Sequence, residues 1–325
     1  MMQPDRLNIL LINLGAPETP NEIRPFLRNL FCDPFIINIP GGKIFRPLLA
    51  EIISGARYKK SKKYYELIGG GSPLLEISRN QAAALEKLLS KHSNSSVRIG
   101  MRYSRPSIED AIRGIPDGER LIVLPMYPQY SYTTTASSIA EFHRAMKKYD
   151  KSLNFSIIPD FRNHPAYLAA CAGIINSHLC TSDLSNARKT ALIFSAHSIP
   201  QKISDEGDPY LWQTRQSVSG IMQLLESPIE HYLSFQSKAG PSKWLEPDTE
   251  GLVAELGSHG CETMIMFPVS FTADNLETLY EMDILFKNIA LKSGVKKFIR
   301  IPALNTDPLF IKCLYQIILS VWKKQ

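Results

Sequence analysis

The stretch that decides the fold is Leu192–Tyr210, LIFSAHSIPQKISDEGDPY. An apolar run from Ala191 to Phe194 opens it, and a short continuous run of this kind predicts a buried strand of a parallel sheet. Pro200 cannot donate to a sheet ladder, so the strand has to end before it. His197 is therefore expected just past the carboxyl end of a strand, the edge where open α/β sheets bind ligands. An isolated histidine is more often a core residue bonded to a backbone carbonyl. The choice between a structural and a ligand-binding role for His197 therefore depends on the rest of the sequence.

The composition is that of an ordinary globular chain. Its 325 residues are 44% hydrophobic, which suffices for one large α/β domain or two medium ones. The net charge of +6 is accompanied by no zinc-finger, RRM or helix-turn-helix pattern, so we expect no nucleic-acid partner. The five cysteines show no CxxC spacing, which favours a reducing compartment, the cytoplasm. We expect neither a signal peptide nor a membrane span.

Strand-like and helix-like segments alternate along most of the chain. Strands are predicted at Leu7–Asn13, Val97–Met101, Arg120–Met126, Asn154–Ile158, Thr190–Phe194, His231–Phe235, Thr263–Pro268 and Lys297–Ile301. Helix-length segments separate them, including residues 134–146 and 275–292. This alternation predicts an α/β fold with parallel sheets and right-handed crossovers.

The two halves of the chain contain similar segments in the same order. The pairs are LLINLGAPETP from Leu10 with ALIFSAHSIPQ from Ala191, GMRYSRPS from Gly100 with SFQSKAGPS from Ser234, and LIVLPMYPQYSYTTT from Leu121 with MIMFPVSFTADNLET from Met264. We therefore predict two similar halves with parallel sheets facing a central cleft, a favoured place for a ligand. The expected regions are residues 1–160, residues 161–306 and a final helix, 307–325, that packs back on the first half.

Polar side chains follow the predicted strands of the second half. They are His197, then Gln236-Ser237-Lys238 with Trp244, then Asp274 and Glu277. An imidazole and a carboxylate from neighbouring strand ends can bind a divalent metal such as iron(II) or move protons. Glu277 and Glu281 are one helical turn apart and share a face. A solvated acidic helix face has the same spacing, so both interpretations stay open.

Different side chains follow the predicted strands of the first half: Leu14, then Arg102 and Tyr103, then Tyr127 and Ser131. Arg57 and Tyr65 lie elsewhere in the same half and add a cation and an aromatic ring. Together they could form a wall for a large flat apolar ligand with carboxylate edges. Core packing of the tyrosines with bonded hydroxyls is the alternative.

The segment Lys43–Lys63 combines an apolar first half with a cationic second half. Its apolar residues are Ile44, Phe45, Leu48, Leu49, Ile52 and Ile53. The segment is either a core helix with a solvated basic end or an exposed apolar lip. A lip would suit an amphiphilic anionic ligand, or weak and reversible contact with a membrane surface.

Six segments together resemble the ferrochelatase family, whose members insert ferrous iron into a porphyrin to make haem. They are FSAHSIP…GDPY (Phe194–Tyr210), NLGAPETP (Asn13–Pro20), IGGGSPL (Ile68–Leu74), YPQYSYTT (Tyr127–Thr134), FQSKAGP…WL (Phe235–Leu245) and ETLYEMD (Glu277–Asp283). They occur in family order over nearly the whole chain. The resemblance implies two Rossmann-like halves around a cleft and a lyase that forms a nitrogen–metal bond. Protoporphyrin IX is the expected substrate and protohaem the product, at the last step of haem biosynthesis. The alternatives are a coproporphyrin III ferrochelatase and a non-catalytic tetrapyrrole or haem carrier.

The resemblance also implies residue roles. His197 and Glu277 match the family's essential pair at the porphyrin centre and are the expected catalytic residues and metal ligands, with Glu281 as a further candidate ligand. The matching porphyrin-binding positions are Leu14, Arg57, Tyr65, Arg102, Tyr103, Tyr127, Ser131 and Trp244. In the family the macrocycle is bent, a strain offset by binding energy from the rest of the ring. Which member of the pair binds metal and which takes protons stays open.

Three positions depart from the family pattern. Asn275 stands where the family usually has histidine, Ala273 where serine is common, and Leu285 where a third carboxylate often follows Glu277 and Glu281. Asn275 cannot titrate near neutral pH, so a proton relay through that position is not expected. The chain ends at Gln325 without a cysteine-bearing extension, so we predict no iron–sulfur cluster. Iron(II) is then a substrate, and no permanently bound cofactor is expected.

Overall fold

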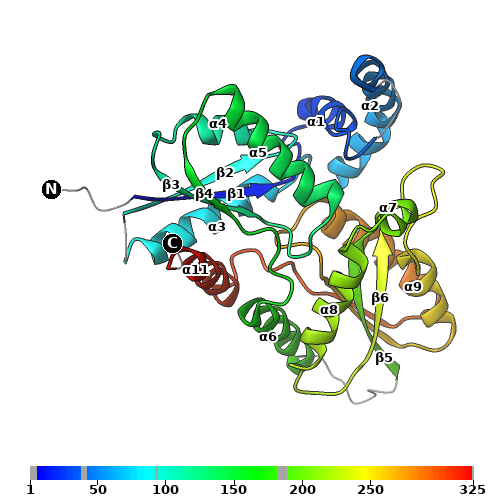
Figure 1. The fold of residues 1–325 in the computed structure, drawn as a ribbon. Coiled ribbons are helices and arrows are strands. Elements are labelled where there is room, and N and C mark those ends of the chain that lie inside the picture. Colours follow the sequence, from blue (N-terminus) through cyan, green and yellow to red (C-terminus); the bar gives the residue numbers. More distant parts are fainter. Residues whose placement is uncertain (1–5, 38–41, 92–93, 182–188, 324–325) are drawn as a thin grey trace. The chain divides into compact units, whose positions relative to one another are not determined.

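The computed structural model describes residues 6–37, 42–91, 94–181 and 189–323. It divides into two compact units, Met1–Asp160 with Ile311–Gln325 and Phe161–Phe310. Each unit contains one four-stranded sheet whose strands all run parallel (Figure 1).

The first sheet has the strand order β2-β1-β3-β4. Its strands are β1 (Leu7–Asn13), β2 (Ser95–Met101), β3 (Arg120–Pro125) and β4 (Asn154–Ile157). Every residue of β1 is buried, as expected of a continuous apolar run between two parallel neighbours. The parallel pairing brings the carboxyl ends of β1, β2 and β3 to one edge of the sheet.

The second sheet repeats this arrangement in the order β6-β5-β7-β8. Its strands are β5 (Thr190–His197), β6 (Glu230–Gln236), β7 (Thr263–Pro268) and β8 (Lys297–Arg300). Segments matched in the sequence therefore hold the same place in both sheets. The placement of His197 just past the end of a strand was wrong, because β5 runs three residues further than predicted and includes it. The ladder with β6 continues through Ser195, Ala196 and His197. Polar residues thus pair within the strand after its apolar run has ended.

Helices connect the strands in both units. In the first unit they are η1 (Pro20–Glu22), α1 (Ile23–Phe31), α2 (Gly42–Leu67), α3 (Leu74–Leu89), α4 (Ile108–Arg113), η2 (Tyr132–Ala136) and α5 (Ser137–Lys148). In the second they are α6 (Pro165–Thr181), α7 (Gln201–Asp205), α8 (Tyr210–Met222), α9 (Thr249–Ser258), η4 (Glu277–Phe286) and α10 (Lys287–Lys292). The last helix is α11 (Pro308–Trp322), most of which belongs to the first unit, and Arg120 Nη2 donates to the Trp322 carbonyl there at 3.1 Å.

Each unit buries a core between its sheet and the helices that follow the second and third strands. In the first unit α4 and α5 cover one sheet face, with Phe142 fully buried, and Figure 1 shows α3 on the opposite face. In the second unit α9, η4 and α10 pack on the sheet in the corresponding way, with Met282 and Phe286 buried. Replacing a buried phenylalanine such as Phe142 or Phe286 with alanine typically lowers the free energy of unfolding by about 3–5 kcal/mol.

The segment after the third strand of each sheet begins as a π-helix. η2 and η4 are these segments, and each continues directly into an α-helix. The periodicity predicted ordinary α-helices over 134–146 and 275–292. A π-turn fits one extra residue into the turn and is frequent at functional sites. The spacing of apolar residues does not reveal a π-turn, because the apolar residues on either side of the turn still face the core.

The apolar face of α2 is largely exposed. Phe45 is 61% exposed, Leu48 63% and Ile52 60%, and their spacing places them on one side of the helix. The side chain of Ile44 lies outside the described residues. The core-helix interpretation of this segment is therefore wrong for these three side chains. Within the described ranges, no helix has the length and apolarity needed to cross a bilayer.

Candidate active site

His197 ends the central strand of the second sheet, and hydrogen bonds fix its backbone on both sides. Its N–H donates to Ser270 Oγ at 2.9 Å, and its carbonyl accepts from the Tyr210 hydroxyl at 2.9 Å. Ser270 follows β7, while Tyr210 opens α8, where Asp208 caps its N–H at 2.9 Å. The GDPY end of the opening stretch thus anchors the histidine that lies thirteen residues before it.

The His197 ring lies within electrostatic reach of Glu277. Burial lowers the pKa of His197, and the Glu277 carboxylate acts in the opposite direction. The ring also packs edge-on against Phe271, with centroids 6.2 Å apart. A lowered pKa leaves the imidazole neutral at pH 7, the form that accepts a proton or binds a metal. The structure therefore brings together the imidazole and the carboxylate that the sequence singled out.

Glu281 lies one turn after Glu277 on η4, close enough for the two carboxyl groups to interact. Its Oε2 accepts from Ser237 Oγ at 2.7 Å and from Gln236 Nε2 at 3.0 Å. Burial and the neighbouring Glu277 raise the pKa of Glu281 to about 8, against the effect of these two donors. The same Gln236 amide donates to the Glu277 carbonyl at 3.1 Å. A carboxylic acid that is protonated near neutral pH and a carboxyl group one turn away make this edge suited to proton transfer.

Trp244 belongs to the segment that pairs with the loop after His197. Pro200 and Trp244 form an antiparallel bridge, and the Leu245 N–H donates to the Ile199 carbonyl at 3.1 Å. Among the described residues, the buried indole Nε1 of Trp244 has no hydrogen-bond partner. The FQSKAGP…WL segment therefore returns to the loop that carries His197.

Two of the departures from the family pattern, Asn275 and Leu285, have structural roles here. Asn275 Oδ1 accepts from the Thr278 N–H at 3.2 Å, so the amide caps the start of η4. Leu285 packs against the core of the second unit. Asp274, a candidate strand-end carboxylate, instead pairs with Arg300 at 2.7 Å and belongs to a structural ion pair.

In the first unit Arg102 and Tyr103 converge on a buried aspartate. Asp33 Oδ2 accepts from Arg102 Nη2 at 2.6 Å and from the Tyr103 hydroxyl at 2.6 Å, and it also accepts from Ser137 Oγ. The Arg102 guanidinium stacks over the Tyr103 ring, 4.8 Å from its centroid. Burial raises the pKa of Tyr103, so its hydroxyl stays protonated. Sequence reasoning missed Asp33, because it follows α1 in a turn with no distinctive motif.

The other predicted residues of the first unit occupy two places. At the carboxyl edge of the sheet, the Leu14 carbonyl accepts from the Tyr103 N–H at 3.0 Å, and the Tyr127 hydroxyl lies 3.4 Å from Ser138 Oγ. Ser131 caps η2 through the Thr133 N–H at 3.3 Å. On α2, Arg57 stacks over the Phe31 ring at 5.8 Å, and Tyr65 is buried.

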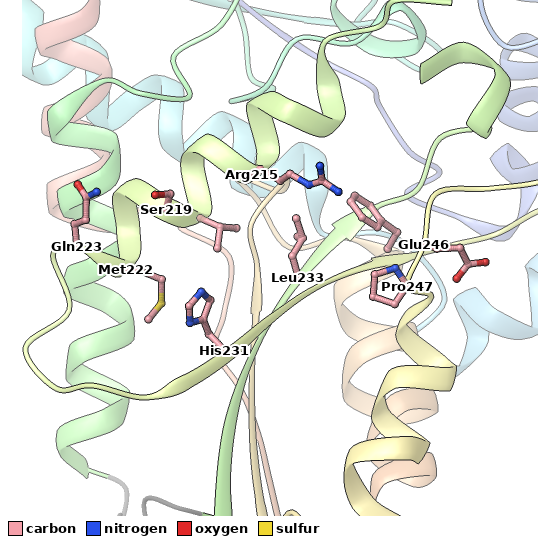
Figure 2. Close-up of a pocket in the computed structure, with 10 residues that line it drawn as sticks. Arg215, Ser219, Met222, Gln223, His231, Leu233, Glu246 and Pro247 are labelled. Atoms are coloured by element: carbon pink, nitrogen blue, oxygen red, sulfur yellow. The ribbon is translucent and has the colours of Figure 1, made fainter. Parts of the chain in front are cut away.

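The described residues of this site form no preformed metal cage. In the described part of the chain no three His, Cys, Asp or Glu side chains gather in a metal-binding group. A cavity of about 510 Å³ in the second unit lies between α8 and β6, lined by Arg215, Val218, Ser219, Met222, Gln223, His231, Leu233, Phe235, Glu246 and Pro247 (Figure 2). None of the predicted site residues lines this cavity.

Comparison with known proteins identifies the family. The ferrochelatase family model matches residues 6–321. The chain belongs to the ferrochelatase family. Among curated ferrochelatases, that of Rippkaea orientalis is 41% identical over 97% of this chain and 82% of its own length. That of Geotalea uraniireducens is 41% identical over 97% of this chain and 98% of its own length. The prediction of a ferrochelatase, an enzyme of haem synthesis that inserts iron, is confirmed.

Solved structures share the fold at low identity. CbiX, the terminal enzyme of sirohaem biosynthesis in denitrifying bacteria, aligns with a TM-score of 0.53 and 13% identity over 96% of this chain and 98% of its own. The sirohydrochlorin chelatase SirB of Bacillus subtilis subspecies spizizenii aligns with a TM-score of 0.50 and 13% identity over 95% and 92%. The predicted chelatase-type α/β fold is thus confirmed for this ferrochelatase.

Proposed function

We propose that this chain inserts ferrous iron into protoporphyrin IX to form protohaem, with His197 and Glu277 as its catalytic residues. The observation that carries the proposal is the pairing of a neutral imidazole with a carboxyl group at the edge of the second sheet. Two N–H protons leave the porphyrin for each Fe²⁺ that enters, so the site needs proton acceptors beside the ring centre. His197 is one acceptor, and the carboxyl group of Glu277 provides the other or binds the incoming iron. Glu281 holds a proton near neutral pH, so it can bind iron only after losing that proton.

The porphyrin-binding residues remain those implied by the family. We assign ring contacts to Leu14, Arg57, Tyr65, Arg102, Tyr103, Tyr127, Ser131 and Trp244. The pairing of Arg102 with Asp33 favours a role in shaping the pocket over direct capture of a porphyrin carboxylate. The exposed apolar face of α2 favours protoporphyrin over the more polar coproporphyrin.

Replacement of His197 tests the proposal. The variant His197→Ala is incubated anaerobically with protoporphyrin IX and Fe²⁺, and iron insertion is monitored by the change in porphyrin absorbance. We expect its kcat to be lower than that of the wild type by at least about a hundredfold. His259→Ala is the matched control, since His259 is exposed at the end of α9. Substantial turnover by His197→Ala would overturn its assignment. Tight haem binding by a wild-type chain that cannot load iron would identify a carrier, and faster turnover of coproporphyrin III would change the substrate.

Three further properties belong to the proposal. We place the chain in the cytoplasm because its cysteines are free thiols. The same dispersed cysteines, of which Cys171 and Cys313 are buried, support the absence of an iron–sulfur cluster, and acid-labile sulfide analysis tests this. The apolar face of α2 with its following lysines supports weak peripheral membrane contact, which sedimentation with anionic vesicles tests.

A further inference from the structure

The side chain that follows β6 has an unusual backbone. Ser237 has a φ of +68°, in the left-handed region that is unfavourable for a non-glycine residue. Gly240 adopts the same conformation three residues later, with a φ of +73°. A serine held in this conformation is a strained residue, and strain of this kind concentrates at functional sites.

The left-handed turn places the Ser237 hydroxyl on one oxygen of Glu281. Ser237 Oγ donates to Glu281 Oε2 at 2.7 Å. Gln236 Nε2 donates to the same oxygen at 3.0 Å. In the described part of the chain neither donor reaches Oε1. Two donors on one oxygen restrict rotation of the carboxyl group and leave the second oxygen available.

The orientation of the Gln236 amide is itself determined by its surroundings. Ser195 Oγ donates to Gln236 Oε1 at 2.5 Å, which turns the amide nitrogen toward η4. Thr249 Oγ1 donates to Ser234 Oγ at 2.9 Å and lies 3.4 Å from Ser195 Oγ. Because this chain of buried hydroxyls supports Gln236, the carboxyl group of Glu281 is held from a rigid sheet edge.

We propose that Ser237 is a positioning residue for iron insertion, whose left-handed backbone turns its hydroxyl onto Glu281 Oε2 and keeps Oε1 directed at the reacting groups. The inference rests on the proposed function, because it acts through the carboxyl group of Glu281. Ser237 itself need not touch either substrate.

Two substitutions separate the hydroxyl from the backbone. Ser237→Ala removes the hydroxyl and keeps the strain, whereas Ser237→Gly removes both. We expect kcat/KM for Fe²⁺ to fall roughly tenfold or more in both variants, since each loses a hydrogen bond to an acidic group. The KM for protoporphyrin IX should stay within about twofold of the wild type, and Ser237→Gly should melt at a higher temperature than Ser237→Ala. Ser237→Asn, which tolerates the left-handed region and keeps a donor, should recover part of the loss.

A matched control tests strain relief alone. Asp150 has a φ of +47° at the end of α5, far along the chain from these residues. Asp150→Gly should raise the melting temperature without changing either KM. Wild-type activity in Ser237→Gly would overturn the positioning role while leaving the proposed function intact. A wild-type chain without turnover would instead overturn the proposed function, and this inference with it.

Discussion

The two units have the same strand order, yet their key carboxyl groups have opposite surroundings. In the first unit Asp33 accepts hydrogen bonds from Arg102, Tyr103 and Ser137, so a full positive charge compensates it. In the second unit Glu281 accepts from the Ser237 hydroxyl and the Gln236 amide, both uncharged donors. The charged groups that act on its pKa in the described chain, Glu277 first, all raise it, and no cation is among them.

This difference separates structure from chemistry within a repeated fold. A buried carboxylate paired with a cation is stable, and its loss is felt by the fold. A buried carboxyl group beside a like charge is unstable as an anion, so it holds a proton that it can give up. The repeated architecture therefore supplies one edge for rigidity and another for reaction, consistent with the tendency of enzymes to accept instability at their sites.

The largest expected effect tests the reactive edge. Glu277→Gln removes a proton-accepting group while keeping its size, so kcat should fall by about a thousandfold. Glu255→Gln is the control and should leave kcat unchanged, because the Glu255 side chain is exposed on α9. Iron insertion measured anaerobically by absorbance decides the matter. Wild-type activity in Glu277→Gln would contradict the claim that the carboxyl groups of the second unit take part in the reaction.

The next effect tests the rigid edge. Asp33→Asn removes the buried counter-charge of Arg102 and leaves it the partly exposed Glu141, 3.9 Å away, so the free energy of unfolding should fall by about 3 kcal/mol. Urea unfolding followed by circular dichroism measures this. Asp117→Asn is the control, because the Asp117 side chain is 60% exposed and lies 3.7 Å from Lys151. A loss no larger than that of Asp117→Asn would show that the Asp33 cluster contributes little to the fold.

The smallest expected effect is a pH-dependent gain in stability of Glu281→Gln relative to the wild type. The pKa of Glu281 is about 8 in the folded state against 4.5 as the ordinary value, so wild-type stability is lost as pH rises through this window. Glu281→Gln cannot ionise, and its advantage over the wild type should grow by about 2 kcal/mol between pH 5 and pH 7. Urea titrations at both pH values measure it. An advantage that stays constant with pH would contradict the raised pKa.

Much of the architecture could be predicted from local patterns. Apolar runs located the inner strands β1, β3, β5 and β7, because strands buried on both faces carry nearly continuous apolar sequence. The paired segments also anticipated that β1 and β5 hold equivalent places in their sheets. Apolar runs did not locate the end of β5, since Ser195 and His197 are polar residues whose pairing comes from β6.

The functional residues divide in a similar way. His197 and Glu277 could be chosen from their places after predicted strands and from the family segments. Asp33 could not, because its partners lie 69, 70 and 104 residues away. The strain at Ser237 was equally hidden, since nothing in its neighbours requires a left-handed backbone.

By itself the sequence determined the family, the α/β class and the residues that carry titratable groups, since these follow from short-range pattern and residue type. Only the tertiary structure decided which carboxyl group is neutralised and which is left beside a like charge. The physical reason is that burial and the distance between charges depend on residues far apart in the chain, and these two quantities determine whether a carboxyl group stabilises the fold or holds a transferable proton.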